Sequence, residues 1–267
     1  MIPPAELGEL EAFRSLVGGW NEGRVAEIGG ALCTAVAAAP SSALFNRAMG
    51  LGLGQQARED ALAEIDRFFA DAGVAYGITV TPDAEPSELT TWLESRGFSR
   101  GYAWTKFQRG VELSPAAQTD LVVERIDADR GHVFADVFQR AYGTPELLRP
   151  RLEQIPAESG WHCFVAFAGG APAATGAVFV TSEVGWLGMA GTLAEFRRRG
   201  AQTTLLAARI DAAREVGCSV VVTETGEPAD GRPDNSYRNI VRAGFEPLYV
   251  RQNYLSSEEA DTSGTRA

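Results

Sequence analysis

The chain has 267 residues, of which 45% are hydrophobic and 22% charged, and its formal net charge is -11 at pH 7. A chain of this length can bury a sizeable core, either as one large domain or as two smaller ones. No apolar run approaches the ~20 residues of a membrane-spanning helix, and so acidic a chain repels phosphate backbones. We therefore expect a globular protein, monomeric or homodimeric, that binds neither membranes nor nucleic acid.

The cysteines and the amino-terminal residues indicate a reducing compartment. Cys33, Cys163 and Cys218 are an odd number, lie far apart and form no CxxC pair, and the chain has only two histidines. This pattern favours buried, reduced thiols over a disulfide framework or a zinc site, and we expect no metal. The opening MIPPAELGELEAF carries acids and prolines where a secretory signal has a basic start and an apolar core, so we expect a cytoplasmic protein.

In the first half, the stretch FNRAMGLG places Asn46 and Arg47 in an apolar strand, where buried structural pairing is the favoured role and contact with a ligand the alternative. The glycines that follow, Gly50, Gly52 and Gly54, are not spaced as G-x-G-x-x-G, and no P-loop lysine comes after them. We interpret these glycines as turn residues.

A proline-containing stretch poor in periodic apolar residues, GVELSPAAQT, separates the two halves. It predicts a domain at 1–112, a linker at 113–119 and a second domain at 120–255. The last twelve residues, 256–267, contain no large apolar side chain and predict a disordered tail.

The second half alternates strand-like and helix-like patterns. Its first predicted elements are a strand at 120–127, helices at 131–143 and at 146–156 (the latter interrupted by Pro150), and strands at 161–168 and 171–182, which form a hairpin around Gly169-Gly170. The elements that follow are a strand at 184–193, a helix at 200–217, a strand at 218–225, a helix at 235–244 and a strand at 245–254. Leu205, Leu206, Ile210 and Ala213 share the inner face of the long helix, which Gly217 ends. This order implies a sheet with mixed parallel and antiparallel pairing.

The two halves share a pattern that predicts an internal structural repeat. Residues 59–82 and 88–109 follow the order helix, glycine stop, strand, short helix, Gly-Phe and strand. Residues 203–224 and 235–254 follow the same order, and Gly97-Phe98 matches Gly244-Phe245.

Three consecutive arginines stand before a glycine at the start of the long helix, in the stretch AEFRRRGAQTTLL. Backbone N–H groups at a helix start point toward one spot and favour an anion there. Gly200 lets a ligand approach the backbone, and Arg197, Arg198 and Arg199 can add positive charge. The two interpretations of this turn are an anion cradle and a solvated basic helix start.

This turn resembles the signature of the GNAT N-acyltransferases, [Q/R]-x-x-G-x-[G/A], in which backbone amides hold the pyrophosphate of acetyl-coenzyme A (acetyl-CoA). Arg197 and Gly200 fit the first and fourth positions, while Gln202 stands where a small residue is expected. The resemblance implies an α/β GNAT fold with a mixed sheet, in tandem, with an amino-terminal half that holds no cofactor because its corresponding turn has no arginine.

The resemblance also implies binding roles. The backbone of Ala190, Gly191 and Thr192 would pair with the pantetheine arm like an added strand. The turn residues would surround the pyrophosphate; they are Arg197, Arg198, Arg199, Gly200, Ala201, Gln202 and Thr203. The polar residues Asn235, Ser236 and Asn239 would contact the pantetheine, although each can equally cap a helix or face solvent, and for Asn235 we favour a cap.

Acyl transfer from a thioester to an amine requires a base, a polarised carbonyl and a proton for the thiolate. Glu224 ends an apolar strand and is the candidate base. The alternative interpretation is that it faces solvent at the end of the strand. The backbone N–H near Thr192 is the candidate carbonyl polariser. Many relatives place a tyrosine, as the acid, four residues before the Gly-Phe glycine, where this chain has Ile240.

Other side chains therefore compete for the role of the acid. They are Tyr237, which we favour, Tyr142 and Tyr249. His132 precedes a helix and can cap it, and His162 begins a strand, so we favour neither as a base.

The leading hypothesis is an acetyl-CoA-dependent N-acetyltransferase that transfers the acetyl group to a primary amine of a small molecule or peptide by direct attack in a ternary complex. Two alternatives stay open. One is a catalytically silent CoA-binding regulatory module; the other is an acetyltransferase similar to the mycothiol synthases, which acetylate a cysteinyl amine.

Overall fold

The computed structural model describes residues 2–227 and 232–256, which form two compact units. Within these residues, the first unit contains residues 2–105 and 249–256, and the second contains 106–227 and 232–248. The division falls within the strands β5 and β11, so each of these strands contributes residues to both units. No helix among the described residues is long and apolar enough to cross a membrane.

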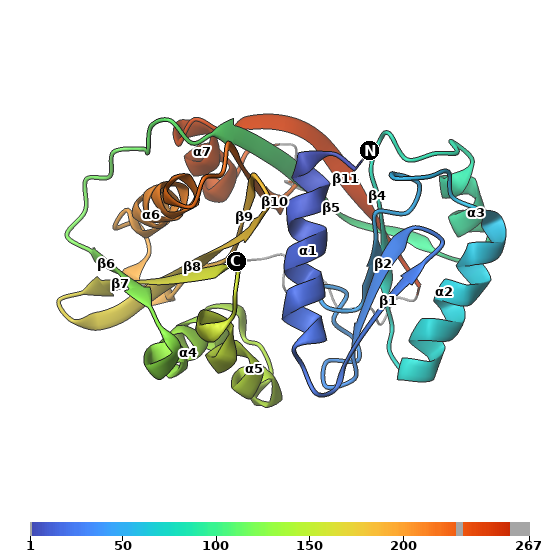
Figure 1. Cartoon of the computed structure of the whole chain (residues 1–267), viewed down its shortest axis with the longest axis horizontal. Coiled ribbons are helices and arrows are strands. Elements are labelled where there is room, and N and C mark those ends of the chain that lie inside the picture. The colour runs from blue at the N-terminus through green and yellow to red at the C-terminus, as the bar shows by residue number, and fades with distance from the viewer. Residues whose placement is uncertain (1, 228–231, 257–267) are drawn as a thin grey trace. The chain divides into compact units, whose positions relative to one another are not determined.

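The first unit has helices on two faces of its strands (Figure 1). Its elements are α1 (Pro4–Gly18), β1 (Gly23–Ile28), β2 (Ala31–Val36), β3 (Arg47–Met49), α2 (Glu59–Ala72), β4 (Gly77–Val80), α3 (Leu89–Ser95), the beginning of β5 (Ser99–Gly110) and the end of β11 (Glu246–Leu255). The pairs β1–β2 and β2–β3 are antiparallel, β3–β4 is parallel and β4–β11 is antiparallel.

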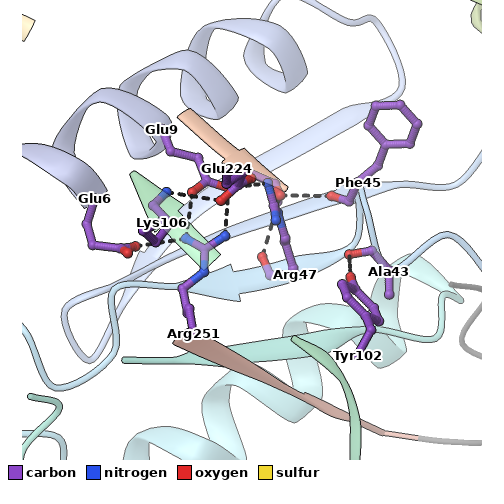
Figure 2. A network of polar contacts seen from close by, with 10 residues as sticks. Glu6, Glu9, Ala43, Phe45, Arg47, Tyr102, Lys106, Glu224 and Arg251 are labelled. Carbon is purple, nitrogen blue, oxygen red and sulfur yellow. Dashed lines mark hydrogen bonds and ion pairs between the residues drawn. The ribbon is translucent and has the colours of Figure 1, made fainter. Parts of the chain in front are cut away.

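A buried cluster of charges joins α1 to the strands of the first unit (Figure 2). Arg47 Nη2 donates to Glu9 Oε1 at 2.6 Å, and Arg251 Nη1 donates to Glu6 Oε2 at 2.8 Å and to Glu9 Oε2 at 2.5 Å. The Arg47 guanidinium also lies 3.9 Å from the ring centroid of Phe13. Because all four charged side chains are at most 1% exposed, their mutual neutralisation is what makes their burial tolerable.

The second unit contains the rest of the chain. Its elements are the end of β5, β6 (Val122–Ile126), α4 (Gly131–Tyr142), α5 (Arg149–Gln154), β7 (Trp161–Ala168), β8 (Ala171–Thr181), β9 (Val184–Thr192), α6 (Ala201–Glu215), β10 (Val220–Gly226), α7 (Asn235–Arg242) and the start of β11, with short 3-10 turns at Ala128–Arg130, Glu146–Leu148, Ile155–Ala157 and Ala194–Phe196. The strands follow the order β5-β10-β9-β8-β7-β6. Strands β6 to β9 pair antiparallel, and β9–β10 is parallel.

Helix α6 covers one face of the second unit's strands, and α4 and α5 cover the other (Figure 1). Leu205, Leu206, Ile210 and Ala213 are all buried in the core beneath α6, as the sequence pattern predicts. Gly217 follows the helix with φ +93°, a backbone conformation that glycine adopts without strain. The core of this unit is therefore built from the predicted face.

The predicted element order of the second half is confirmed, including the hairpin around Gly169-Gly170 and the mixed pairing. The predicted helix at 146–156 is divided into a 3-10 turn, α5 and a second 3-10 turn, and Pro150 stands in the first turn of α5, where its missing N–H costs nothing. One detail is wrong. His132 does not cap α4: it is exposed within the first turn, and the N-cap residue is Arg130.

The repeat predicted between the halves is present in the order of elements. Helix α2, β4, α3 and β5 follow one another as α6, β10, α7 and β11 do, and both Gly97 and Gly244 have φ above +80°. Each series supplies a strand to both units, since β5 and β11 both span the division.

The predicted residues of the first half have structural roles. Asn46 accepts the Val36 N–H and donates to Ala39 O, and Arg47 belongs to the buried charge cluster. Gly50 and Gly52 lie in a turn at φ +81° and +82°. All three cysteines are free and buried, as predicted, and burial raises the pKa of the Cys33 thiol to about 12.

The predicted domain boundaries, 1–112 and 120–255 with a linker at 113–119, stay a prediction, because the compact units follow spatial packing and the end of β11 packs with the first unit. The predicted tail at 256–267 lies outside the described residues except for Ser256.

Helix α7 is capped by Asp234 rather than by Asn235. The Asp234 carboxylate accepts the backbone N–H of Tyr237 at 2.7 Å. Asn235 is instead the first helical residue, and its side chain accepts a hydrogen bond from Arg238. The interpretation of Asn235 as the cap is therefore wrong by one position.

We expect Asp234→Ala to lower the free energy of unfolding by about 1 kcal/mol, because an N-cap side chain satisfies an otherwise unpaired N–H. Asn235→Ala is the matched control and should change it by less than about 0.5 kcal/mol. Urea denaturation of both variants measures the difference. Equal losses in the two variants would contradict the assignment of the cap.

Candidate functional site

Strands β9 and β10 separate before either of them ends. Their parallel pairing covers only Val184–Trp186 and Val220–Val222, although β9 runs on to Thr192 and β10 to Gly226. Just beyond the paired part, the Thr223 hydroxyl donates to Leu187 O at 2.9 Å. Beyond these pairs, the carboxyl-terminal parts of β9 and β10 therefore form no β ladder with each other.

A bulge shapes β9 in this separated part. Gly176 of β8 is opposed by two residues of β9, Met189 and Ala190, because the register shifts between Thr175 and Ala177. Met189 has φ +52°, a left-handed conformation that costs an ordinary residue about 1–2 kcal/mol. Surrounding contacts must compensate for this strain.

The turn between β9 and α6 has the geometry of an anion cradle. Arg198 and Gly200 have φ of +65° and +84°, and Gly200 is the N-cap residue of α6. A Cβ on Gly200 would lie 3.2 Å from Thr119 Cβ, so a side chain here would be both strained and crowded. Within the described residues, no acceptor bonds the backbone N–H groups from Arg198 to Thr203.

Residues before β6 hold this turn in place. The Thr119 hydroxyl donates to Arg199 O at 2.6 Å and accepts the Leu121 N–H at 3.1 Å. Arg199 forms an exposed ion pair with Asp120, and its guanidinium holds the pKa of that carboxyl below its usual range. Arg199 is therefore engaged within the protein, whereas Arg197 and Arg198 are exposed.

The side chain of Gln202 is directed to α7. Its Nε2 donates to Ser236 Oγ at 3.0 Å, and its Oε1 accepts from Asn239 Nδ2 at 2.8 Å. This side chain is thus held by α7 rather than folded over the amides of the turn. The structure brings together three predicted site residues from two helices that are far apart in the sequence.

The backbone of Ala190, Gly191 and Thr192 lies at the end of β9, leading into the turn. The Ala190 carbonyl accepts the Tyr142 hydroxyl at 2.8 Å, and the Thr192 carbonyl accepts Arg197 Nε at 3.4 Å. A Cβ on Gly191 would lie 2.7 Å from Ala141 Cβ, so glycine is required for α4 to pack here.

Glu224 lies on the separated part of β10 and is only 10% exposed. Its Oε2 lies 3.0 Å from Nζ of Lys106 on β5, which is fully buried (Figure 2). Its interpretation as a solvent-facing strand end is therefore wrong. Lys106 is a residue that sequence reasoning missed, although a signal existed: it is the only lysine in the chain.

The tyrosines differ in what their hydroxyls can do. Tyr237 packs edge-on against Phe107 with ring centroids 5.0 Å apart, and within the described residues its hydroxyl forms no hydrogen bond. The Tyr142 proton is used in the bond to Ala190 O, and burial raises the pKa of Tyr142 to about 12. Tyr249 belongs to the first unit, where it donates to Glu6.

Two further candidates lie outside this arrangement. Ile240, at the position of the relatives' tyrosine, is 3% exposed and packs in the core of the second unit. His162 is half-buried on β7, and burial, with a contribution from Arg125, lowers its pKa. Among residues 2–227 and 232–256, no three His, Cys, Asp or Glu side chains form a group that could hold a metal.

The fold and the site define an α/β protein in which a turn with unbonded backbone N–H groups follows two diverging parallel strands. Residues 132–232 match the family model described as the Acetyltransferase (GNAT) family. The matched stretch contains β9, the turn, α6 and β10. The chain has the GNAT fold in a two-domain arrangement.

Similar solved structures extend over most of the chain. A GCN5-related N-acetyltransferase from Kribbella flavida is 20% identical with a TM-score of 0.69, and the match covers 96% of each chain. One from Sphaerobacter thermophilus is 14% identical with a TM-score of 0.62, covering 95% of this chain and 93% of that one. A tandem GNAT protein from the clavulanic acid biosynthesis pathway is 17% identical with a TM-score of 0.57, covering 86% and 79%. No curated protein sequence matches the chain.

The buried Tyr142 hydroxyl predicts a loss of stability at alkaline pH. Its pKa is raised from 10 to about 12, so between these values the unfolded chain releases a proton that the folded protein keeps. The free energy of unfolding should therefore fall as pH rises from 10 to 12, by up to about 3 kcal/mol for two pKa units.

Tyr142→Phe should remove this contribution. Urea midpoints measured at pH 9 and at pH 11.5 should differ less in the variant than in the parent protein. A parallel decline in the two proteins would show that Tyr142 is ionised equally in the folded and unfolded states.

Proposed function

We propose that the protein is an acetyl-CoA-dependent N-acetyltransferase that acts on a primary amine of a small molecule or peptide, by direct attack in a ternary complex. The observation that carries the proposal is the turn before α6, where the backbone N–H groups from Arg198 to Thr203 have no acceptor among the described residues. The GNAT family match of the same stretch supports it.

The residues of the turn fit a pyrophosphate. Consecutive free N–H groups at a helix start, with the helix dipole behind them, suit a doubly charged phosphate pair. Gly200 permits the left-handed turn packed against Thr119, and the exposed side chains of Arg197 and Arg198 add charge-assisted donors. In this proposal Arg199 orders the turn through Asp120, while Ala201, Gln202 and Thr203 contribute backbone amides.

The end of β9 fits an extended arm. Ala190, Gly191 and Thr192 lie beyond the last pairing with β10, so their backbone can pair with the amides of a pantetheine as with an added strand. Asn235, Ser236 and Asn239 are proposed to border the same arm from α7. The bonds of Ser236 and Asn239 to Gln202 would fix their orientation.

When bound, acetyl-CoA supplies the thioester whose acetyl group is transferred. The Glu224 carboxylate is proposed to accept a proton from the attacking amine, directly or through water, because it is the acidic side chain on the separated part of β10. Lys106 Nζ would orient that carboxylate. The Tyr237 hydroxyl is the proposed proton donor, since it has no other partner among the described residues.

The amino-terminal domain is proposed to hold no second cofactor. In its loop between β3 and α2, Glu85 N donates to Gly52 O at 3.0 Å, and Ala57 N donates to Glu85 O at 2.7 Å. A Cβ on Gly52 would lie 2.6 Å from Glu85 O. These contacts of the Glu85 backbone with the loop before α2 support the proposal.

Two other functions compete. A silent CoA-binding regulatory module would keep the turn and lack turnover, and the core position of Ile240 favours testing this directly. An acetyltransferase similar to the mycothiol synthases would act on a cysteinyl amine. The net charge of -11 attracts cationic acceptors in general and therefore does not separate one amine from another.

Acetyl-CoA should stabilise the protein against heat. At ~100 times its dissociation constant, a ligand adds ~2.7 kcal/mol to the free energy of unfolding. The gain should disappear in Gly200→Ala, because its Cβ meets Thr119 in a left-handed backbone, and in the double variant R197Q/R198Q. Arg67→Gln, an exposed arginine of α2, is the control and should retain it. No shift in the parent protein would remove the cofactor from the account.

Glu224→Gln should lower kcat by about 100-fold or more while leaving acetyl-CoA binding intact, because the amide cannot accept the proton. Thiol release over a panel of amines, including a cysteinyl amine, measures turnover. Glu246→Gln, an exposed carboxylate at the start of β11, serves as the control. Binding without turnover on any amine in the parent protein would favour the silent module; full turnover in Glu224→Gln would end its assignment as the base.

A further inference from the structure

A buried arginine beneath β9 has no carboxylate partner within the part of the chain that the structure describes. Arg209 of α6 is 2% exposed, and among the described residues it forms no ion pair. Burial lowers the pKa of its guanidinium to about 10, so the group still carries its charge at pH 7. A buried charge without a counterion is unfavourable unless other dipoles solvate it.

Backbone carbonyls take the place of that counterion. Arg209 Nη1 lies 3.3 Å from Gly188 O and 3.5 Å from Ala177 O, and Nε donates to Leu205 O at 3.0 Å. Gly188 and Ala177 are partners across the β8–β9 ladder and border the bulge. The guanidinium therefore bridges the two strands at the point where their register shifts.

Arg209 is one of four side chains that bond consecutive carbonyls of β9. Thr223 of β10 donates to Leu187 O at 2.9 Å, Arg209 to Gly188 O at 3.3 Å, Thr175 of β8 to Met189 O at 3.1 Å, and Tyr142 of α4 to Ala190 O at 2.8 Å. The donors come from four different elements. Helices α6 and α4 supply two of them from opposite faces of the strands (Figure 1).

Glycines make room for two of these donors. A Cβ on Gly176 would lie 3.0 Å from Arg209 Nε and 3.1 Å from its Cζ, and a Cβ on Gly191 would lie 3.0 Å from the Tyr142 ring. Glycine thus stands at the two positions where a side chain would collide with Arg209 or with Tyr142. The segment 187–190 is held in its bulged shape by contacts that ladder pairing to β10 does not supply.

We infer that Arg209, assisted by Tyr142, is a positioning residue that fixes the shape of β9 before the cofactor binds. The inference rests on the proposed function, in which the end of β9 receives the pantetheine arm. A strand that is already fixed loses less conformational freedom when a ligand pairs with it, so its affinity for that ligand is higher. Arg209 would act through the backbone of β9 without touching substrate or cofactor.

The test compares Arg209→Met, Arg209→Lys and Tyr142→Phe with the control Arg214→Met, which replaces a more exposed arginine on the same helix. Hydrogen exchange of backbone amides 187–192 in the ligand-free protein is the first readout, and acetyl-CoA affinity by calorimetry is the second. We expect Arg209→Met to speed exchange in this segment at least tenfold and to weaken affinity at least tenfold. Arg209→Lys should recover part of both, and Arg214→Met should match the parent within twofold.

Unchanged exchange at 187–192 in Arg209→Met would overturn the inference, as would faster exchange with unchanged affinity. If Arg209→Met does not fold, Tyr142→Phe and Gly176→Ala, which crowds the guanidinium, test the same segment. If the parent protein does not bind acetyl-CoA, the proposed function fails, while the exchange readout still tells whether these side chains fix β9.

Discussion

The separation of β9 from β10 after three paired residues is the constraint on which the site depends. A strand inside a sheet normally satisfies its carbonyls and N–H groups through its neighbours. Beyond Trp186 that partner is lost on one side, yet the segment continues, bulges and contains a left-handed Met189. Its carbonyls are satisfied by side chains instead. Packing offsets the free-energy cost of separating the two strands, and the backbone at the end of β9 becomes available to a ligand.

The same chain handles buried charge in three different ways. In the first unit, two arginines and two glutamates neutralise one another in one cluster. In the second, Lys106 forms a buried pair with Glu224, while Arg209 is bonded by backbone carbonyls and, among the described residues, by no carboxylate. The Lys106–Glu224 pair and Arg209 lie on or beside the separated strands β9 and β10. A charge in this position can affect a ligand that binds between the strands as well as the stability of the fold.

The sequence predicts the fold well wherever periodicity is strong. The face of α6, the hairpin at Gly169-Gly170 and the repeated order of elements all follow from patterns within one segment. The Arg-Arg-Arg-Gly turn is likewise local in the sequence, and the structure gives its Gly200 a left-handed conformation. By contrast, the partners of Gln202 lie more than thirty residues downstream, and no local pattern can supply such a pairing.

The remaining misses have physical reasons as well. Asp234 and Asn235 are both good caps, and a one-residue choice between them depends on backbone angles that composition does not encode. The burial of Arg209 could not be predicted, because an arginine on an amphipathic helix is expected to face solvent. Only the structure shows that Gly176 lies opposite Arg209 and makes room for it. Lys106 could be singled out from the sequence only as the one lysine of the chain. Its partner Glu224 lies more than a hundred residues downstream, so no local pattern predicts the pair.

We propose that the separated end of β9 and the turn before α6 together form the acetyl-CoA site, and that the chain has one such site. Hydrogen exchange measured with and without saturating acetyl-CoA is the sharpest test. We expect protection of amides 190–192 and 198–203, with no change at 50–58, the loop before α2 in the first unit. Protection at 50–58, or none at the turn, would contradict it.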